Sequence, residues 1–263
     1  MLQKNIKVLW NKRIKPLYYK IGLMTHKGYS KTKPGQFVML RLTNQTVPLL
    51  NRPFSIHNLI ISGPTEGIEI LYKVVGRFTK KLSTLKPDDS IDILGPLGNN
   101  FTISEKDSKV FLIAGGIGVA PIYFLAAYLK KIQGLSNIKV FLGGKSSGDL
   151  LCLDDFHRIG ITAHISTNDG SAGEKGLITK MLNSELIANK PEVVYACGPN
   201  PMLRSVAAIT DAHTVKCQVS IETIMACGIG ACLGCAVESK KKSAKYLHTC
   251  IDGPVFNTIT ITI

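Results

Sequence analysis

Four cysteines near the end of the chain constrain its fold more than any other feature of the sequence. Cys227, Cys232, Cys235 and Cys250 are spaced C-x4-C-x2-C-x14-C, with glycines at 228, 230 and 234. This asymmetric spacing is typical of plant-type [2Fe–2S] ligation, whereas structural zinc sites more often use two C-x2-C pairs or cysteine and histidine pairs. Glycines also permit the unusual φ and ψ angles with which a loop directs backbone N–H groups at cluster sulfurs. We therefore interpret the loop as a [2Fe–2S] site, with a zinc site and free thiols as the alternatives.

The rest of the 263-residue chain has room for about two domains. Up to residue 103, short apolar runs separated by turns (QFVMLRL, FSIHNLII, GIEILYKVV and SIDILGPLG) predict an antiparallel β-barrel or β-sandwich, and we take the barrel. Beyond it, the strands KVFLIAGG, IKVFLGG, ITAHIST and EVVYACG alternate with helices expected at 120–133, 176–189 and 200–211, which predicts a doubly wound parallel sheet. We thus expect a multidomain α/β protein with a barrel at 1–103, an α/β domain at 104–215 and a cysteine module at 216–263.

Two glycine turns follow strands of the predicted α/β domain. The first, AGGIGVAP, contains Gly115, Gly116 and Gly118, and the second, CGPNPML, contains Cys197 and Gly198. Such turns let a backbone approach a pyrophosphate at a helix N-terminus, at the end of the sheet where ligands bind. Tight turns without a ligand are the alternative. Cys197 is either an ordinary buried thiol or a residue beside a nicotinamide.

The stretch NRPFSIHN in the predicted barrel combines residue types that could hold a phosphate and a planar ring. Arg52 could hold a phosphate bidentately. Phe54 could lie against a planar ring while Ser55 offers a hydrogen bond to the edge of that ring. The alternative is an edge strand with a surface arginine.

The formal net charge of +14 is compatible with nucleic acid, an anionic protein or anionic cofactors. The lysines are scattered, however, and the one dense run, at 240–242 with Lys245, reads as a solvated hairpin, so we expect no nucleic-acid partner. No apolar run approaches the roughly 18 residues of a membrane span, and the first residues lack a signal-peptide pattern. We expect a cytoplasmic protein, in which clustered thiols indicate metal or redox chemistry. Cys152 and Cys217 have no partner at ligand spacing and are expected in the core.

The chain resembles a known family across its whole length. The stretches PLLNRPFSI, DILGPLGNNF, NDGSAGEKG and CGIGACLGCAV with CIDGPVF are similar to those of the electron-transfer subunits of class 1B dihydroorotate dehydrogenase, in the ferredoxin–NADP reductase superfamily. The resemblance implies NAD in the sheet and FAD in the barrel. The implied FAD residues are Arg52, Pro53, Phe54, Ser55, Leu71, Tyr72, Lys73, Phe78 and Thr79. The family usually has glycine where this chain has Phe78, so a bulky side chain could crowd the approach to the FAD phosphates.

The same resemblance implies a partner and an electron path. A catalytic subunit with FMN would oxidise dihydroorotate to orotate in pyrimidine biosynthesis, in a heterotetramer with two copies of each chain. Electrons would pass from FMN through the cluster and FAD to NAD⁺, and this chain needs no catalytic residue of its own. NAD and NADP stay open, because KSSGDL offers neither an acidic residue at the strand end nor an arginine.

Two other interpretations remain. One is a small flavin and iron–sulfur subunit of an NADH-dependent ferredoxin–NADP reductase, a sulfide dehydrogenase or a hydrogenase, although the C-x4-C spacing argues against it. The other is a basic zinc-binding nucleic-acid module.

Overall fold

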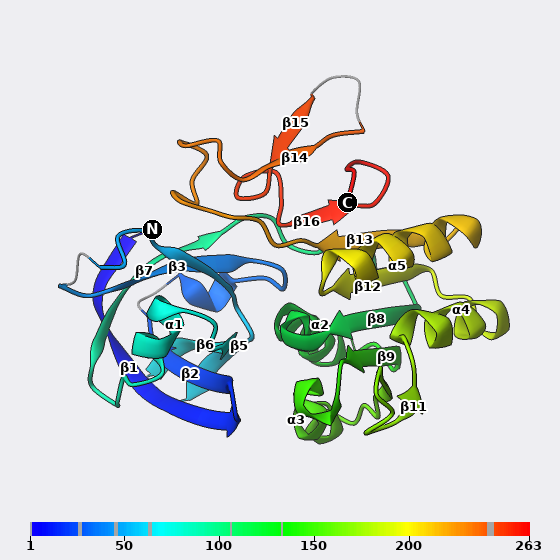
Figure 1. Cartoon of the computed structure of the whole chain (residues 1–263), viewed down its shortest axis with the longest axis horizontal. Helices are drawn as coiled ribbons and strands as arrows, with labels where there is room; N and C mark the ends of the chain where they lie inside the picture. Colours follow the sequence, from blue (N-terminus) through cyan, green and yellow to red (C-terminus); the bar gives the residue numbers. More distant parts are fainter. Residues whose placement is uncertain are drawn as a thin grey trace.

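The computed structural model describes residues 2–25, 28–44, 47–62, 65–105, 107–132, 134–240 and 245–263. Two seven-stranded sheets lie next to each other, and a small hairpin from the cysteine segment lies above them (Figure 1). The lysine run at 240–242 lies partly outside the described residues. Among those that are described, no helix combines the length and apolarity needed to cross a membrane.

The first sheet is antiparallel throughout and curves around the first apolar core (Figure 1). Its strands follow the order β4-β3-β7-β1-β2-β6-β5. The bounds are β1 Leu2–Lys15, β2 Tyr18–Met24, β3 Phe37–Leu42, β4 Arg52–Ser55, β5 Asn58–Ser62, β6 Thr65–Lys73 and β7 Ser90–Leu97, with the short helices η1 Tyr29–Lys31 and α1 Arg77–Leu82. The single strand expected at FSIHNLII is divided, because the chain crosses from one edge of the sheet to the other at Ile56 and His57. Their N–H groups bind the carbonyls of Gln36 and Glu69 respectively.

The second sheet has the order β11-β10-β9-β8-β12-β13-β16 and is parallel except where β16 joins β13. Its strands are β8 Lys109–Gly115, β9 Asn137–Gly144, β10 His164–Thr167, β11 Glu174–Lys175, β12 Val193–Cys197, β13 Lys216–Ser220 and β16 Val255–Asn257. Helices α2 Val119–Ile132 and α3 Leu153–Arg158 pack on one face, and α4 Ile178–Ala188 and α5 Asn200–Ala212 on the other. The short helices η2 Gly116–Gly118 and η3 Ser147–Asp149 follow β8 and β9. The predicted doubly wound arrangement is therefore confirmed. The sequence pattern indicated α2, α4 and α5 but not the short helix α3.

The boundary expected between residues 215 and 216 does not coincide with an edge of the second sheet. β13 hydrogen-bonds to β12 in parallel, and β16 then adds to β13 in antiparallel orientation. Both strands therefore belong to the α/β sheet, and the cysteine segment is the stretch 221–254 between them. This segment contains the hairpin of β14 Ala236–Glu238 and β15 Tyr246–His248. The sequence pattern marks a short strand at 216 but not the sheet to which that strand adds.

Strand β3 shows why one stretch of sequence is apolar at nearly every position. Val38, Leu40 and Leu42 face the barrel core, as the two-residue period of a strand requires. Phe37 and Met39 point to the opposite face and pack against cysteines of the segment above. The strand is buried on both faces because the cysteine segment covers the outside of the barrel at this point.

A buried polar cluster joins the barrel to the α/β domain. His57, which is fully buried, places Nε2 3.3 Å from Glu69 Oε1 and 3.9 Å from Cys152 Sγ. Its Nδ1 lies 3.1 Å from the Ala120 carbonyl, and because a carbonyl only accepts, Nδ1 carries the hydrogen. Lys20 pairs with Asp155 at 2.6 Å, so charges from both domains balance in the interface. Cys152 is thus buried as expected, at a domain interface.

This cluster predicts an acid-sensitive component of stability. Burial, followed by the nearby Lys20 ammonium, lowers the pKa of His57 to about 3, against about 6.5 in an unfolded chain. The unfolded state therefore takes up a proton first, and the free energy of unfolding falls as the pH drops below about 6.5, by at most about 1.4 kcal/mol per pH unit. Between pH 7.5 and pH 5.5, which lie about one unit on either side of the unfolded-state pKa, the melting temperature of the parent should fall. The melting temperature of His57→Gln should fall by less over the same interval in thermal unfolding. Parallel profiles for parent and variant would contradict this assignment.

Candidate functional site

The four loop cysteines form two pairs in space. Cys235 Sγ lies 3.3 Å from Cys250 Sγ, and both side chains are buried. Cys227 is half-buried and Cys232 is exposed. Thiolates that share one tetrahedral metal ion lie about 3.8 Å apart, given metal–sulfur bonds of about 2.3 Å. The sulfurs of the buried pair are thus about 0.5 Å closer than two ligands of one metal ion, so a small outward shift of either sulfur would let both bind the same ion.

Backbone N–H groups of the loop are directed at these sulfurs, as the glycine content predicted. Cys227 Sγ accepts from the N–H groups of Ile229 at 3.5 Å and Cys232 at 3.4 Å, and Cys250 Sγ accepts from Gly230 N–H at 3.2 Å. These N–H groups lower the pKa of Cys227 to about 6, while burial and the neighbouring Cys235 raise the pKa of Cys250 to about 12. Cys227 is thus set up to ionise without a metal, whereas Cys250 needs a nearby cation to ionise. The donor set fits a four-thiolate metal centre.

Two of the loop glycines are required by both conformation and space. Gly228 and Gly230 have φ angles of +74° and +79°. A Cβ on Gly228 would lie 2.6 Å from Met39 Cγ on the barrel, and a Cβ on Gly230 would overlap the side chain of Ile251. The loop therefore wraps the cysteines while lying directly on strand β3.

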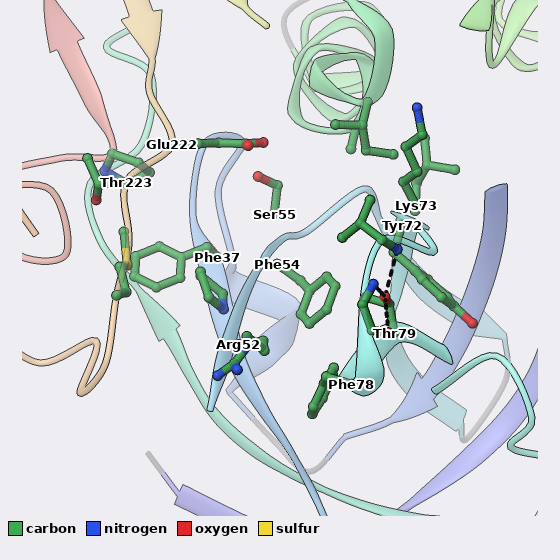
Figure 2. Close-up of a pocket in the computed structure, with 18 of the residues that line it drawn as sticks. Phe37, Arg52, Phe54, Ser55, Tyr72, Lys73, Phe78, Thr79, Glu222 and Thr223 are labelled. Atoms are coloured by element: carbon green, nitrogen blue, oxygen red, sulfur yellow. Dashed lines mark hydrogen bonds between the residues drawn. The ribbon is translucent and has the colours of Figure 1, made fainter. Parts of the chain in front are cut away.

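A cavity of about 560 Å³ opens beside this module, between the two large sheets. That volume is within the range of small-molecule and cofactor pockets. Figure 2 shows side chains from β4, β6, α1 and the segment after β13 reaching toward it. All nine residues that the resemblance assigned to FAD line this cavity: Arg52, Pro53, Phe54, Ser55, Leu71, Tyr72, Lys73, Phe78 and Thr79.

Aromatic rings form the barrel side of the cavity. Phe54 lies 6.3 Å from the Tyr72 ring and 5.8 Å from the Phe78 ring, measured between centroids. Tyr72 is held in place by a 3.0 Å hydrogen bond from its hydroxyl to Asn11 Oδ1. Phe78 is almost fully buried in the barrel core, so its bulk packs beneath the cavity beside Phe54.

The turn before α1 is held by a side chain and leaves space at a glycine. Thr79 Oγ1 accepts from the N–H groups of Val75 at 2.9 Å and Gly76 at 3.1 Å (Figure 2). Gly76 has an extended φ of −164°, which any residue can adopt, and no atom lies within 4 Å of where its Cβ would stand. Neither conformation nor packing requires this glycine, and the space beside it is open where it lines the cavity.

The charged ends of two FAD candidates, Arg52 and Lys73, are held by neighbouring groups. Arg52 uses Nη1 for hydrogen bonds to the carbonyls of Leu50 and Asn51, which directs the guanidinium along the loop before β4. Lys73 lies 3.8 Å from Asp149 of the α/β domain and 4.9 Å from the centre of the Tyr18 ring. The hydrogen bond with Tyr18, against a smaller effect of burial, raises the pKa of Lys73, which stays charged.

The segment after β13 supplies cavity residues that sequence reasoning missed. Ile221, Glu222, Thr223 and Met225 of this segment line the cavity, together with Ser220 at the end of β13. Ser55 and Glu222 both reach into it with their polar ends (Figure 2). Desolvation by surrounding protein raises the pKa of Glu222, and Thr223 Oγ1 has no hydrogen-bond partner among the described residues. Their adjacency to the first cysteine was the available signal, but only the tertiary fold brings them to the barrel.

The candidate NAD residues meet each other at the carboxyl ends of β8 and β12. A Cβ on Gly118 would lie 2.6 Å from the carbonyl carbon of Cys197, and a Cβ on Gly198 would lie 3.0 Å from Gly115 N. Gly116 differs, because its φ is +53° and its Cβ direction points to open space. None of these five is among the described residues that line the cavity. Their neighbours Ile117 and Ala120 do line it, so the two turns stand at its edge.

Cys197 is a buried thiol beneath that edge. It is almost fully buried, and burial followed by nearby Glu222 raises its pKa well above the ordinary range. As a neutral thiol it is no nucleophile at physiological pH.

Two family models match the chain. The iron-sulfur cluster binding domain of dihydroorotate dehydrogenase B matches residues 222–262, and the oxidoreductase NAD-binding domain matches residues 112–208. The first match confirms the iron–sulfur interpretation of the cysteine loop over the zinc and free-thiol alternatives. The second confirms the interpretation of the α/β domain as an NAD-binding domain.

Solved structures agree with the fold. The structure of an NADH-dependent reduced ferredoxin–NADP oxidoreductase is similar with a TM-score of 0.84 and 28% identity, covering 98% of this chain and 90% of that chain. A ferredoxin NADP⁺ reductase from Neisseria gonorrhoeae, solved with bound FAD and NADP, has a TM-score of 0.66 at 16% identity and covers 81% of this chain and 91% of its own. The second likeness shows the fold alone.

Curated relatives are more similar in sequence. The electron transfer subunit of dihydroorotate dehydrogenase B (NAD(+)) from Desulforamulus reducens is 39% identical over 228 residues, 85% of this chain and 84% of the relative. The subunit of the same name from Caldanaerobacter subterraneus subsp. tengcongensis is 39% identical over 251 residues, 95% of this chain and 94% of the relative. The chain therefore belongs to the family of electron transfer subunits of dihydroorotate dehydrogenase B.

Proposed function

We propose that this chain carries electrons between a catalytic subunit that oxidises dihydroorotate and NAD⁺, with one FAD and one [2Fe–2S] cluster. The cofactors supply the electron-transfer chemistry, and the chain holds them and sets their surroundings. The observation that supports this most directly is the shared position of the two sites. The cavity with all nine FAD candidates is also lined by Glu222, Thr223 and Met225, which lie directly before Cys227 in the chain.

Each group of residues has a role in this proposal. Arg52 and the open turn at Gly76 would receive the FAD phosphates, and the Phe54 ring would lie against the flavin. Cys227 with Cys232 and Cys235 with Cys250 would each bind one iron. The turns at Gly116 and Gly198 would receive the NAD phosphates, beside the end of the flavin cavity. NAD as the preferred nucleotide is part of the proposal and follows the names of the relatives.

A second subunit with FMN would dock on the cysteine segment. Apolar side chains in and beside the loop are exposed: Ile224 by 89%, Ile229 by 56%, Leu233 by 58% and Ile251 by 52%. Large exposed apolar residues gathered on one segment mark interaction sites more often than chance placement does. Docking there would bring the partner's FMN to the side of the exposed Cys232. We extend the proposal to a heterotetramer with two copies of each chain and to a cytoplasmic location.

The composition of the purified protein tests the cofactor part. After anaerobic reconstitution we expect about one FAD, two irons and two sulfides per chain, as a plant-type [2Fe–2S] centre requires. Zinc in place of iron would contradict the cluster assignment.

The partner part is tested by adding the catalytic subunit from one of the relatives. This chain alone should reduce no NAD⁺ with dihydroorotate, because the FAD candidates and the two glycine turns account for the cavity between the two sheets and for its edge. The two subunits together should form orotate and NADH. Turnover by this chain alone would contradict the division of labour.

A further inference from the structure

Three apolar side chains separate the flavin cavity from the buried cysteine pair. Phe37, Met39 and Met225, here called the septum, form one cluster with Cys235 and Cys250, apart from the three larger cores. Met39 is 1% exposed, Phe37 3% and Met225 7%. The inner half of the metal site is therefore in contact with a dry apolar layer.

The septum touches both sites at once. Phe37 and Met225 line the cavity, whereas Met39 lies on the side of the cysteine loop, where it limits position 228 to glycine. Phe37 and Met39 come from the outer face of β3, and Met225 comes from the segment that leads to Cys227. Phe37 and Met225, which line the cavity, therefore belong to the same apolar cluster as the two buried cysteines.

The two cysteine pairs consequently have different surroundings. Cys235 and Cys250 are 3% and 4% exposed and meet the septum, whereas Cys232 is exposed to solvent. The reduction potential of an iron–sulfur cluster depends on solvent exposure and on hydrogen bonds to its sulfurs. Reduction adds negative charge, which an apolar, water-free surrounding disfavours. Polarity introduced at the septum should therefore make the cluster easier to reduce.

We propose that the septum lowers the reduction potential of the cluster by keeping water and polar groups away from its buried iron, on the side facing the flavin. This inference rests on the proposed function, since it requires the [2Fe–2S] cluster. It assigns Phe37, Met39 and Met225 as positioning residues that act through the cysteines.

Met39→Gln tests the inference, because it keeps the side-chain length and adds an amide outside the flavin cavity. The measurement is a redox titration of the cluster by electron paramagnetic resonance, on the full chain loaded with FAD and cluster. At the parental midpoint, we expect the ratio of reduced to oxidised cluster to rise roughly threefold, a positive shift of about 28 mV at 59 mV per tenfold change. Met225→Gln should shift the potential in the same direction and gives a second reading if Met39→Gln folds poorly.

Two controls separate polarity from general disturbance. Met39→Leu keeps the layer apolar and should leave the midpoint unchanged. Met181→Gln places the same amide on α4, against the far core of the α/β domain, and should also leave it unchanged. Unshifted midpoints in both septum variants, with two irons still bound, would overturn the inference alone. Absence of a [2Fe–2S] signal from the parent would instead overturn the proposed function.

Discussion

Cys232→Ser is expected to remove the cluster and to leave flavin reduction by NADH intact. A hydroxyl is a poor ligand for iron in such a centre, and Cys232 is the exposed member of the outer pair. The candidate residues for FAD lie in the barrel, and those for NAD lie in the turns after β8 and β12, so both sets are outside the cysteine loop. NADH should therefore still reduce the flavin and pass electrons to a small artificial acceptor. Dihydroorotate-driven reduction of NAD⁺ in the two-subunit complex should fall to background.

The fold supports a point substitution as the cleaner test. β13 and β16 flank the cysteine segment and belong to the α/β sheet, so deleting everything after residue 215 would remove two strands of that sheet. Because cluster loss could also loosen the subunit interface, complex formation is measured by gel filtration beside activity. If the variant stays assembled, lacks the cluster and couples dihydroorotate to NAD⁺ at the parental rate, the cluster lies outside the electron path.

Gly118→Ala is expected to cost about 2 kcal/mol or more of unfolding free energy, the usual range for overpacking a tight contact. The added Cβ would stand 2.6 Å from the carbonyl carbon of Cys197 and 2.7 Å from Gly198 N, and both are backbone atoms that cannot rotate away. The two turns would be forced apart, so NADH binding should weaken together with stability. Denaturant unfolding and NADH titration of the flavin-loaded chain measure the two effects.

Gly116→Ala is the matched control for packing. Its Cβ would meet open space, and only the φ of +53° disfavours alanine, by about 1 kcal/mol. If NAD phosphates approach this position, the methyl group should lower NADH affinity about tenfold, or about 1.4 kcal/mol, with little loss of stability. Unchanged NADH affinity in Gly116→Ala would show that the turns only pack against each other.

Features that depend on residues close together in the chain could be predicted from the amino-acid sequence. The spacing of Cys227, Cys232, Cys235 and Cys250 indicated the ligand set, because a short loop with glycines can present several sulfurs to one centre. The alternation of strands and helices after residue 104 indicated the doubly wound sheet for a similar local reason, since period and turn chemistry are read within a few residues.

Contacts between segments far apart in the chain became known only from the folded structure. β13 and β16 enter the α/β sheet through pairing that no local pattern specifies, and Glu222 reaches the barrel cavity because that sheet turns the chain toward it. The apolar run of β3 was visible, but its second buried face became explicable only with the cysteine segment lying on Phe37 and Met39. The difference in burial between the two cysteine pairs also comes from contacts with distant segments. Burial and electrostatic surroundings are set by contacts between segments far apart in sequence, whereas ligand spacing and secondary structure are set within one segment.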